Sequence, residues 1–321
     1  GLERFRKPGR LVMTAHTAAD AEAVVAARGV GPKPLVKRLV LRLRPELRRE
    51  IEAGPFLPAD RVIVHSPEAE AALKERLERP GAVQHWPMPV PKWSVPASHW
   101  GPLSQRLKVE GRRLVTIFGF VTPEKDCPLA MRATALVRER YPNGVLVIAG
   151  GARDEAGDRY LRHLQQLGRK ISDRGRRGGM LLIALTRALH GSEEAVRALL
   201  SPFRFTGYLS DPDARALLMH TEIALLPYRS ATGSYAAGAA LASGCPLLTS
   251  DLPAFAEPLP ALRFRAGDVQ DLAGKLDQLL SDTAARVALA ERSRQYAAEN
   301  SWTRSAERHV ALYRELSEAS S

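Results

Sequence analysis

The stretch that decides the fold lies at residues 203–257 and reads FRFTGYLSDPDARALLMHTEIALLPYRSATGSYAAGAALASGCPLLTSDLPAFAE. Residues 223–226 are apolar throughout, as expected of a parallel strand that is buried on both faces. The spacing predicts a strand at 203–206, a helix from Asp211 or Asp213 to His220, the strand at 223–226, a helix at 236–243 that ends at Gly244, and a strand at 246–250. Such an alternation of strands and helices indicates an α/β fold with a parallel sheet.

The loop at 228–235, YRSATGSY, leads into a helix made almost entirely of small residues. A helix N-terminus offers unpaired N–H groups and a partial positive charge, which suits a phosphate. Gly233 leaves room for a ligand, and Thr232 and Ser234 offer hydroxyl groups. A tightly packed crossover without a ligand explains the local pattern equally well, because one Gly-rich turn is weak support for a site.

Length and composition bound the class of protein. A chain of 321 residues suggests two domains, and the formal net charge of +12 predicts an acidic partner: nucleic acid, an anionic membrane face or a phosphorylated substrate. There is no apolar run long enough to cross a bilayer, and no stretch resembles a secretory signal. Cys127 and Cys245 lie far apart without metal-binding spacing, so we expect reduced thiols in a cytoplasmic protein.

Two basic segments stand out. Residues 33–49 carry leucines every four positions among arginines and lysines, which fits either a helix packed on its own sheet or peripheral contact with an anionic membrane. Residues 169–177 form a basic, glycine-containing run within 168–200, a region to which the sequence assigns no role. A solvated surface loop or a loop beside an acidic ligand would both fit.

The other expected elements form two α/β series. The first has strands at 10–14, 60–66 and 82–87 and a helix at 66–77, and a Pro-, Ser- and Trp-containing linker at 87–111 places the domain boundary near residue 105. The second has strands at 113–118 and 145–149, a helix at 127–140 and, after residue 257, helices at 268–280, 282–299 and 302–318.

His16 and Lys125 each follow an expected parallel strand, at the sheet edge where α/β proteins bind ligands. A lysine there can meet a phosphate as a point charge. By position alone, an ordinary loop histidine and a solvent-facing lysine explain these residues as well.

Eight pieces of the chain, in order, resemble the nucleotide-sugar glycosyltransferases of family 4, which have the GT-B fold. They are MTAHT at 13–17, ADRVIVHSPEAEAAL at 59–73, WPMPVP at 86–91, FGFVTPEKDCPLAMRA at 118–133, VLVIAGG at 145–151, FRFTGYLSDPDARALLMHTEIALLPYR at 203–229, ALASGCPLLTSDLPAFAE at 240–257 and NSWTRSAERHVALYREL at 300–316. The resemblance implies two Rossmann-like domains: a partial acceptor-side domain at 1–105, a donor-side domain at 106–295, and a helix at 296–321 that packs back toward the first domain.

The same resemblance implies a donor site. Lys125 matches the lysine that meets the donor diphosphate, His16 the histidine that reaches the donor sugar, and Gly119 the glycine loop near the phosphates. Tyr208 follows the glycine of the turn where the family holds the base. The expected set is His16 and Lys125 as catalytic residues, with Gly119, Gly150, Gly207, Tyr208, Arg229, Thr232, Gly233, Ser234 and Tyr235 binding the donor. Family members transfer sugar with retention of configuration and without a bound metal. The co-substrate is a nucleotide-diphosphate sugar, and the acceptor could be a glycan, a lipid-linked intermediate or a small molecule.

The chemistry of the residues agrees with that expectation. A departing nucleoside diphosphate gains negative charge, which Lys125 and the N–H groups at 233–235 would offset. The pair Asp211 and Asp213 stands at a helix start and is interpreted as a cap rather than a metal site.

Two features depart from the family. Ala231 and Ala239 stand where the family commonly has two glutamates, of which the first contacts the donor sugar and the second the ribose. The first domain begins at what should be a middle strand, so we expect it to be incomplete. These departures motivate the alternative of a non-catalytic subunit or scaffold. The charge of +12 motivates a third hypothesis, a basic nucleic-acid-binding protein, although no recognisable reading helix or aromatic stacking motif supports specific binding.

Overall fold

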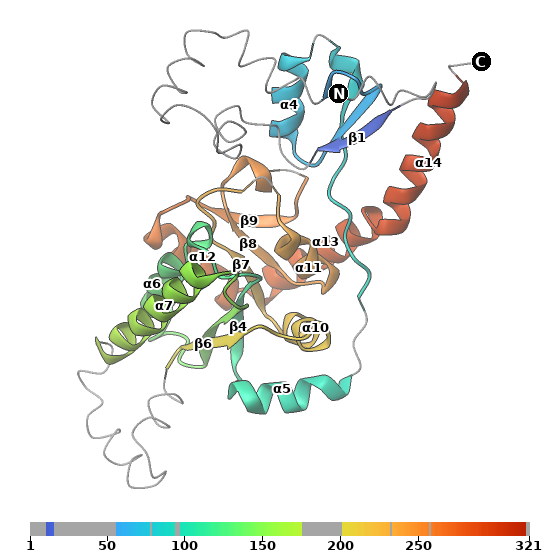
Figure 1. The fold of residues 1–321 in the computed structure, drawn as a ribbon. Coiled ribbons are helices and arrows are strands. Elements are labelled where there is room, and N and C mark those ends of the chain that lie inside the picture. The colour runs from blue at the N-terminus through green and yellow to red at the C-terminus, as the bar shows by residue number, and fades with distance from the viewer. Residues whose placement is uncertain are drawn as a thin grey trace, which may run out of the picture. The chain divides into compact units, whose positions relative to one another are not determined.

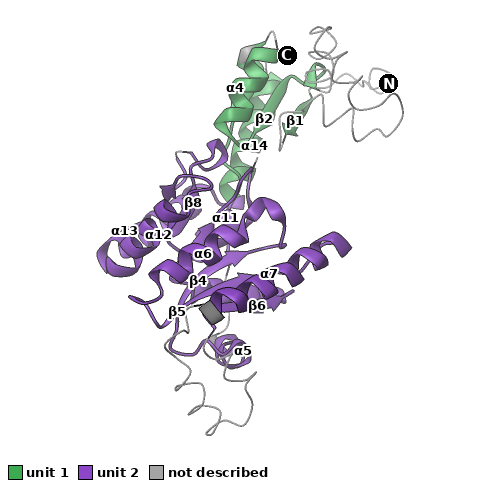
Figure 2. Cartoon of the chain, turned by 90° about the vertical axis from the view of Figure 1, so that its left-hand side faces the viewer, with its two compact units in different colours: residues 1–88, 303–321 green, residues 89–302 purple. Residues whose placement is uncertain are grey.

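The computed structural model describes residues 11–15, 56–77, 79–93, 97–174, 201–231, 233–256 and 258–318. The chain divides into two compact units, one of residues 1–88 with 303–321 and one of residues 89–302 (Figure 2). His16, Thr232, the segment 33–49 and most of the segment 168–200 lie outside the described residues.

The larger unit contains a six-stranded sheet in the order β6-β5-β4-β7-β8-β9, and every described pair of neighbouring strands is parallel (Figure 1). The strands are β4 (Arg113–Phe118), β5 (Gly144–Ala149), β6 (Phe203–Gly207), β7 (Ile223–Leu226), β8 (Leu247–Ser250) and β9 (Ala261–Phe264). This is the doubly wound order of a Rossmann-like domain, as expected from the alternating pattern.

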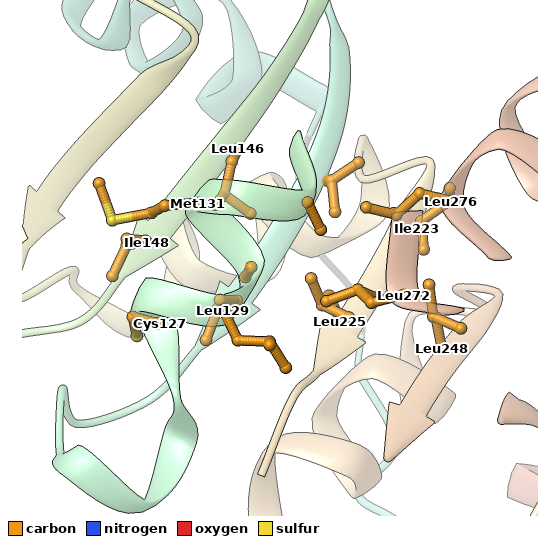
Figure 3. Close-up of a cluster of buried hydrophobic side chains, with 14 of the residues drawn as sticks. Cys127, Leu129, Met131, Leu146, Ile148, Ile223, Leu225, Leu248, Leu272 and Leu276 are labelled. Atoms are coloured by element: carbon orange, nitrogen blue, oxygen red, sulfur yellow. The ribbon is translucent and has the colours of Figure 1, made fainter. Parts of the chain in front are cut away.

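One face of this sheet is covered by α6 (Cys127–Val137), α7 (Glu155–Arg174) and α12 (Val269–Ser281). Alternate strand residues point into that layer, among them Leu146 and Ile148 of β5 and Leu225 of β7 (Figure 3). They pack with Met131 of α6, and the whole cluster is buried. The period of two along each strand therefore sends the intervening residues to the opposite face.

The opposite face is covered by α5 (Trp100–Leu107), α10 (Asp211–Met219) and α11 (Tyr235–Ala242), and α13 (Thr283–Glu299) packs on α11. Val145 and Val147 of β5 point to this side. Leu103 and Leu107 of α5 are buried here, so residues 89–105, expected before the domain boundary, belong to the larger unit.

The smaller unit has a parallel sheet in the order β1-β2-β3, formed by β1 (Val12–Ala15), β2 (Arg61–Val64) and β3 (Val83–His85). Helix α4 (Pro67–Arg76) packs with Val62 and Val64 of β2 on one face. Helix α14 (Trp302–Glu318) contributes Leu312 and Leu316 to a cluster with Ile63 on the other. The chain thus has mixed α/β architecture with a Rossmann-like arrangement in both units.

Several elements differ from the sequence prediction. Ser210 caps α10 by accepting from the backbone N–H of Asp213 at 3.4 Å, so neither Asp211 nor Asp213 is the cap. Helices α5 and α7 and strand β9 were not predicted, and α6 ends at Val137 rather than at 140. Four short 3₁₀ turns complete the described structure: η3 (Pro80–Ala82), η4 (Ala97–His99), η5 (Pro123–Lys125) and η6 (Pro253–Phe255).

Candidate functional site

The strand order of the larger unit locates the candidate site. Strand β4 connects through α6 to β5 on one side, whereas β7 connects through α11 to β8 on the other. The loops after β4 and β7 therefore leave two neighbouring strands toward opposite faces. In open α/β sheets, ligands bind at this switch point, outside the carboxyl ends of the strands.

Glycines bring the ends of three strands together. A Cβ on Gly119, after β4, would lie 2.7 Å from the Lys125 ammonium nitrogen, and one on Gly150, after β5, would lie 2.1 Å from the Gly119 carbonyl oxygen. Gly150 also forms a bridge to Gly207 at the end of β6. Side chains at positions 119 and 150 would clash, so these two predicted glycines allow the close approach that shapes this edge, whereas Gly207 adopts a φ of +66° with open space around its Cβ position.

Lys125, at the end of η5, is buried rather than solvent-facing. Its ammonium donates to the Phe118 carbonyl oxygen at 2.6 Å and lies 5.8 Å from the centre of the Tyr228 ring. Burial lowers the pKa of Lys125 from its ordinary value of 10.5 to about 8, so the side chain still carries its charge at neutral pH. An ammonium has three donors, and no second acceptor for it occurs within the described ranges.

The N-terminus of α11 also lies near Tyr228. Ser234 caps the helix, its Oγ accepting from the backbone N–H of Ala237 at 3.2 Å. The Tyr228 hydroxyl lies 3.4 Å from the same Oγ. One buried tyrosine therefore contacts both Lys125 and the capped helix start, which places the two predicted phosphate-binding features beside one side chain.

The first N–H groups of α11 have no acceptor among the described residues. The N–H groups of Ala237 and Gly238 both point to the Ser234 carbonyl, at 3.1 and 3.2 Å. Those of Tyr235 and Ala236 precede the first intrahelical bond and have no acceptor in the part of the chain that is described. This start of the helix can therefore donate to an anion.

Arg229 is engaged in an ion pair with Asp126. Its Nε and Nη2 donate to the two Asp126 carboxylate oxygens at 2.8 and 3.2 Å. Asp126 caps α6 by accepting from the Leu129 N–H, and its own φ is +37°. The pair joins the loop after β4 to the loop after β7. Sequence reasoning missed both Asp126 and Tyr228, because their contacts join segments about a hundred residues apart.

Exposed aromatic side chains stand near the same sheet edge. Tyr208, after β6, is 78 % exposed and Tyr235, at the first turn of α11, is 65 % exposed. Phe120 follows β4, and the Arg153 guanidinium lies over its ring, 5.1 Å from the ring centre. These rings present flat apolar surfaces to solvent, which a nucleobase or a sugar can cover.

Ala231 and Ala239, which stand where family 4 commonly has glutamates, have different surroundings. Ala239 is completely buried within α11, among the residues that pack on β7 and β8. Ala231 is partly buried and packs against the same cluster. Neither position offers a carboxylate.

Two further properties concern metals and membranes. Within the described ranges, His, Cys, Asp and Glu side chains form no group of three or more that could hold a metal ion. No helix there combines the length and the apolar character that a membrane span needs.

The free thiols of Cys127 and Cys245 are buried, and burial raises the pKa of each to about 12.

Comparisons with known proteins agree with this architecture. The model of the family described as glycosyl transferases group 1 matches residues 184–282, which include β6 to β9 and α11. No curated protein matches the chain by sequence.

Solved structures match nearly the whole chain. HepE of Anabaena, in complex with UDP and glucose, has a TM-score of 0.61 and 15 % identity over 94 % of this chain and 70 % of its own. Sucrose-phosphate synthase from Thermosynechococcus elongatus has a TM-score of 0.66 and 18 % identity over 99 % and 70 %. A UDP-forming α,α-trehalose-phosphate synthase from Burkholderia xenovorans has a TM-score of 0.67 and 14 % identity over 98 % and 70 %.

The fold is therefore that of the GT-B glycosyltransferases, with two Rossmann-like domains. Residues 184–282 carry the sequence pattern of glycosyl transferases group 1.

Proposed function

We propose that this protein is a glycosyltransferase that moves a sugar from a nucleotide-diphosphate donor to an acceptor, with retention and without a metal, as in family 4. The supporting observation is that the Lys125 ammonium and the Ser234-capped start of α11 both contact Tyr228 at the switch point of the sheet. The donor binds to the larger unit, in the domain expected at 106–295. We further propose that the protein works in the cytoplasm, that the basic segment 33–49 contacts an anionic membrane, and that no specific nucleic acid is a partner.

The chemistry follows from charge. When the bond between the sugar and the diphosphate breaks, the leaving group gains negative charge, and Lys125 and the N–H groups of Tyr235 and Ala236 stabilise it where it develops. In a retaining front-face reaction, the leaving phosphate accepts the acceptor proton, so no protein nucleophile is needed. His16 is proposed to reach the donor sugar, and Thr232 and Gly233 are proposed to bind the donor.

The base and the sugar of the donor are further proposals. HepE is described in complex with UDP, and the trehalose-phosphate synthase as UDP-forming. We therefore propose UDP as the nucleotide, with its base next to Gly207 and Tyr208, and a hexose or deoxyhexose as the sugar.

Calorimetric titration with UDP, GDP and dTDP tests the donor site. We expect UDP to bind at pH 7 and Lys125→Met to weaken binding by about tenfold or more, because a charge-assisted hydrogen bond is worth roughly 1.5–3 kcal/mol. Lys170→Met, on an exposed turn of α7, is the matched control and should bind UDP as the parent does. Absence of binding for all three nucleotides would contradict the proposal.

A second candidate function is a non-catalytic subunit with the same fold. The observation that favours it is the lack of a carboxylate at Ala231 and at the buried Ala239. Release of UDP from UDP-sugars by the purified chain, measured with and without a chelator, separates the two functions and tests metal independence. The anomeric configuration of the product, read by NMR, tests retention. Nucleotide binding without any turnover would favour the non-catalytic subunit.

A further inference from the structure

We propose that Arg153 is a phosphate-binding residue of the candidate site and that the ring of Phe120 holds its guanidinium in place. The inference deepens the proposed function and rests on it for the identity of the ligand, a nucleoside diphosphate. It adds a second cation, beside Lys125, that the sequence did not indicate.

Arg153 lies in the loop between β5 and α7, at the carboxyl end of the sheet. Its guanidinium lies over the Phe120 ring, 5.1 Å from the ring centre. Phe120 belongs to the loop after β4, so this contact joins the loops that follow two neighbouring strands. An arginine at this distance is attracted to the negative face of an aromatic ring. The contact therefore restricts where a long and flexible side chain places its charge.

The backbone around this contact is also fixed. The N–H of Val121 donates to the Gly151 carbonyl oxygen at 3.0 Å, and the N–H of Gly119 donates to the Ala149 carbonyl oxygen at 2.9 Å. The two donors stand directly before and after Phe120 in the sequence. The position of one loop against the other therefore does not depend on the contact between the guanidinium and the ring alone.

The same loop connects this pair to Lys125. The Lys125 ammonium donates to the Phe118 carbonyl oxygen at 2.6 Å, and a Cβ on Gly119 would lie 2.7 Å from its nitrogen. The ammonium thus lies against the backbone of residues 118–119, and Phe120 is the next residue. Consecutive Cα atoms are only about 3.8 Å apart. The ring under the Arg153 guanidinium therefore starts one residue from the backbone that Lys125 contacts.

The Arg153 guanidinium has unused donors. Arg153 is exposed, and its guanidinium makes no hydrogen bond and no ion pair within the described ranges. The acidic residues that follow it are engaged elsewhere: Asp154 accepts from the Gly157 N–H at 2.8 Å, and Glu155 pairs with Arg159 at 3.3 Å. A guanidinium has five N–H donors in a planar fork that matches two phosphate oxygens. Arg153 can therefore bind a phosphate without first breaking an ion pair.

The strand order favours a phosphate, rather than the base, as the partner of Arg153. Along this part of the sheet the order is β6, β5, β4 and β7. Tyr208 follows β6, Arg153 follows β5 and Lys125 follows β4, while α11 follows β7. In the proposed binding mode, the base lies next to Tyr208, and Lys125 and the start of α11 hold the leaving phosphate. Arg153 comes between these two ends, which corresponds to the phosphate nearest the nucleoside.

The first test is calorimetric titration with UDP at pH 7. Arg153→Met should weaken UDP binding by about tenfold, because it removes charge-assisted hydrogen bonds. Arg153→Lys keeps the charge without the planar fork and should recover part of that loss. Arg162→Met removes an exposed arginine of α7 and is the matched control, which should bind UDP as the parent protein does. Both positions are exposed, so we expect every variant to fold. Unchanged UDP affinity in Arg153→Met would overturn the inference.

The second test uses inorganic pyrophosphate, which has no base. Arg153→Met should weaken pyrophosphate binding by about the same factor as UDP binding. A loss for UDP without a loss for pyrophosphate would mean that Arg153 contacts the nucleoside, and this would overturn the inference. A parent protein that does not bind pyrophosphate would overturn it as well, whether or not UDP binds. A parent protein that binds pyrophosphate but no nucleotide would contradict the proposed function, and the pyrophosphate titrations would then decide the role of Arg153.

A double-mutant cycle tests whether Phe120 holds Arg153. Phe120→Leu removes the ring but keeps an apolar side chain, and it should weaken binding of UDP and of pyrophosphate several-fold because the guanidinium loses its contact. In the Arg153→Met background, the same substitution should have no further effect. Equal losses from Phe120→Leu in both backgrounds would show that the ring acts on the ligand independently of Arg153, and would overturn its positioning role.

Discussion

Two buried cations in the larger unit have very different surroundings. Arg204 on β6 and Lys125 after β4 are each 9 % exposed. The Arg204 guanidinium donates to the carbonyl oxygens of Leu107, Ser201, Phe203 and Lys108 at 2.8 to 3.3 Å. The Lys125 ammonium donates to one carbonyl, that of Phe118.

The difference in hydrogen bonding indicates that Arg204 has a structural role and that Lys125 has a functional one. Burial lowers the pKa of both side chains, but the guanidinium keeps its proton and donates to four backbone carbonyl oxygens. The Lys125 ammonium is equally buried, but only one of its three N–H donors has a partner among the described residues. Buried charge that is incompletely hydrogen-bonded points to a ligand that completes the set.

The largest expected effect is on Arg204. Arg204→Met removes the donor from four carbonyl oxygens between α5 and β6, so we expect the free energy of unfolding to fall by about 3–5 kcal/mol. Guanidinium chloride unfolding followed by circular dichroism measures this, and UDP affinity of the folded fraction should not change. A loss below about 1 kcal/mol would mean that the hydrogen bonds of Arg204 do not contribute substantially to stability, and the contrast with Lys125 would not hold.

In contrast to Arg204→Met, the substitution Lys125→Met should raise the free energy of unfolding at pH 7. Because the pKa in the folded state is about 8 and the ordinary value is 10.5, the folded protein bears the full desolvation cost below pH 8. Between pH 8 and 10.5 the folded protein has lost this proton while the unfolded chain keeps it. The free energy of unfolding of the parent protein should therefore rise by about 3 kcal/mol over this range. We expect Lys125→Met to be about 1–2 kcal/mol more stable at pH 7, after loss of its one hydrogen bond, and to lack this rise.

Unfolding curves of the parent and of Lys125→Met at pH 7, 8, 9 and 10 check this prediction. UDP affinity of the parent should fall above pH 8 as the free ammonium loses its proton. If the free energy of unfolding changed with pH in the same way for both proteins, burial would not lower the pKa of Lys125.

A smaller effect is expected at Gly119. The φ of Gly119 is +95°, and a Cβ there would lie 2.7 Å from the Lys125 ammonium nitrogen. Gly119→Ala should therefore displace Lys125 and weaken UDP binding several-fold, with a loss of stability of about 1–2 kcal/mol from backbone strain. Gly111→Ala, also at positive φ but with open space around its Cβ, is the matched control. Equal losses of UDP affinity in both variants would show that Lys125 is not involved.

Most of the strands could be predicted from the sequence, because continuous apolar runs such as 223–226 require burial on both faces. Helix α7 was not predicted, and its last turns fall in the segment 168–200, to which the sequence assigned no role. In the structure Gly168 lies inside the helix, and a Cβ there would meet Met131 at 3.0 Å and Phe203 at 3.3 Å. A tertiary contact, rather than local propensity, therefore explains this glycine. Helix α5 tolerates Pro102 because proline is accepted in the first turn.

The site was predictable only in part. The position of Lys125 follows from the strand before it, since loops at the carboxyl ends of parallel strands carry ligand-binding groups. Its burial, its contact with Tyr228 and the pairing of Asp126 with Arg229 depend on a second loop about a hundred residues away, and no local pattern specifies them.

The two thiols have a practical consequence. Both cysteines of the chain are buried, and the Cys245 thiol also donates to the Leu218 carbonyl oxygen at 2.8 Å, so alkylating dyes should leave the folded protein unlabelled. A single cysteine introduced in place of the exposed Tyr235 would then be the one reactive position, and a fluorophore attached there would report ligand arrival at the start of α11 through its change in emission.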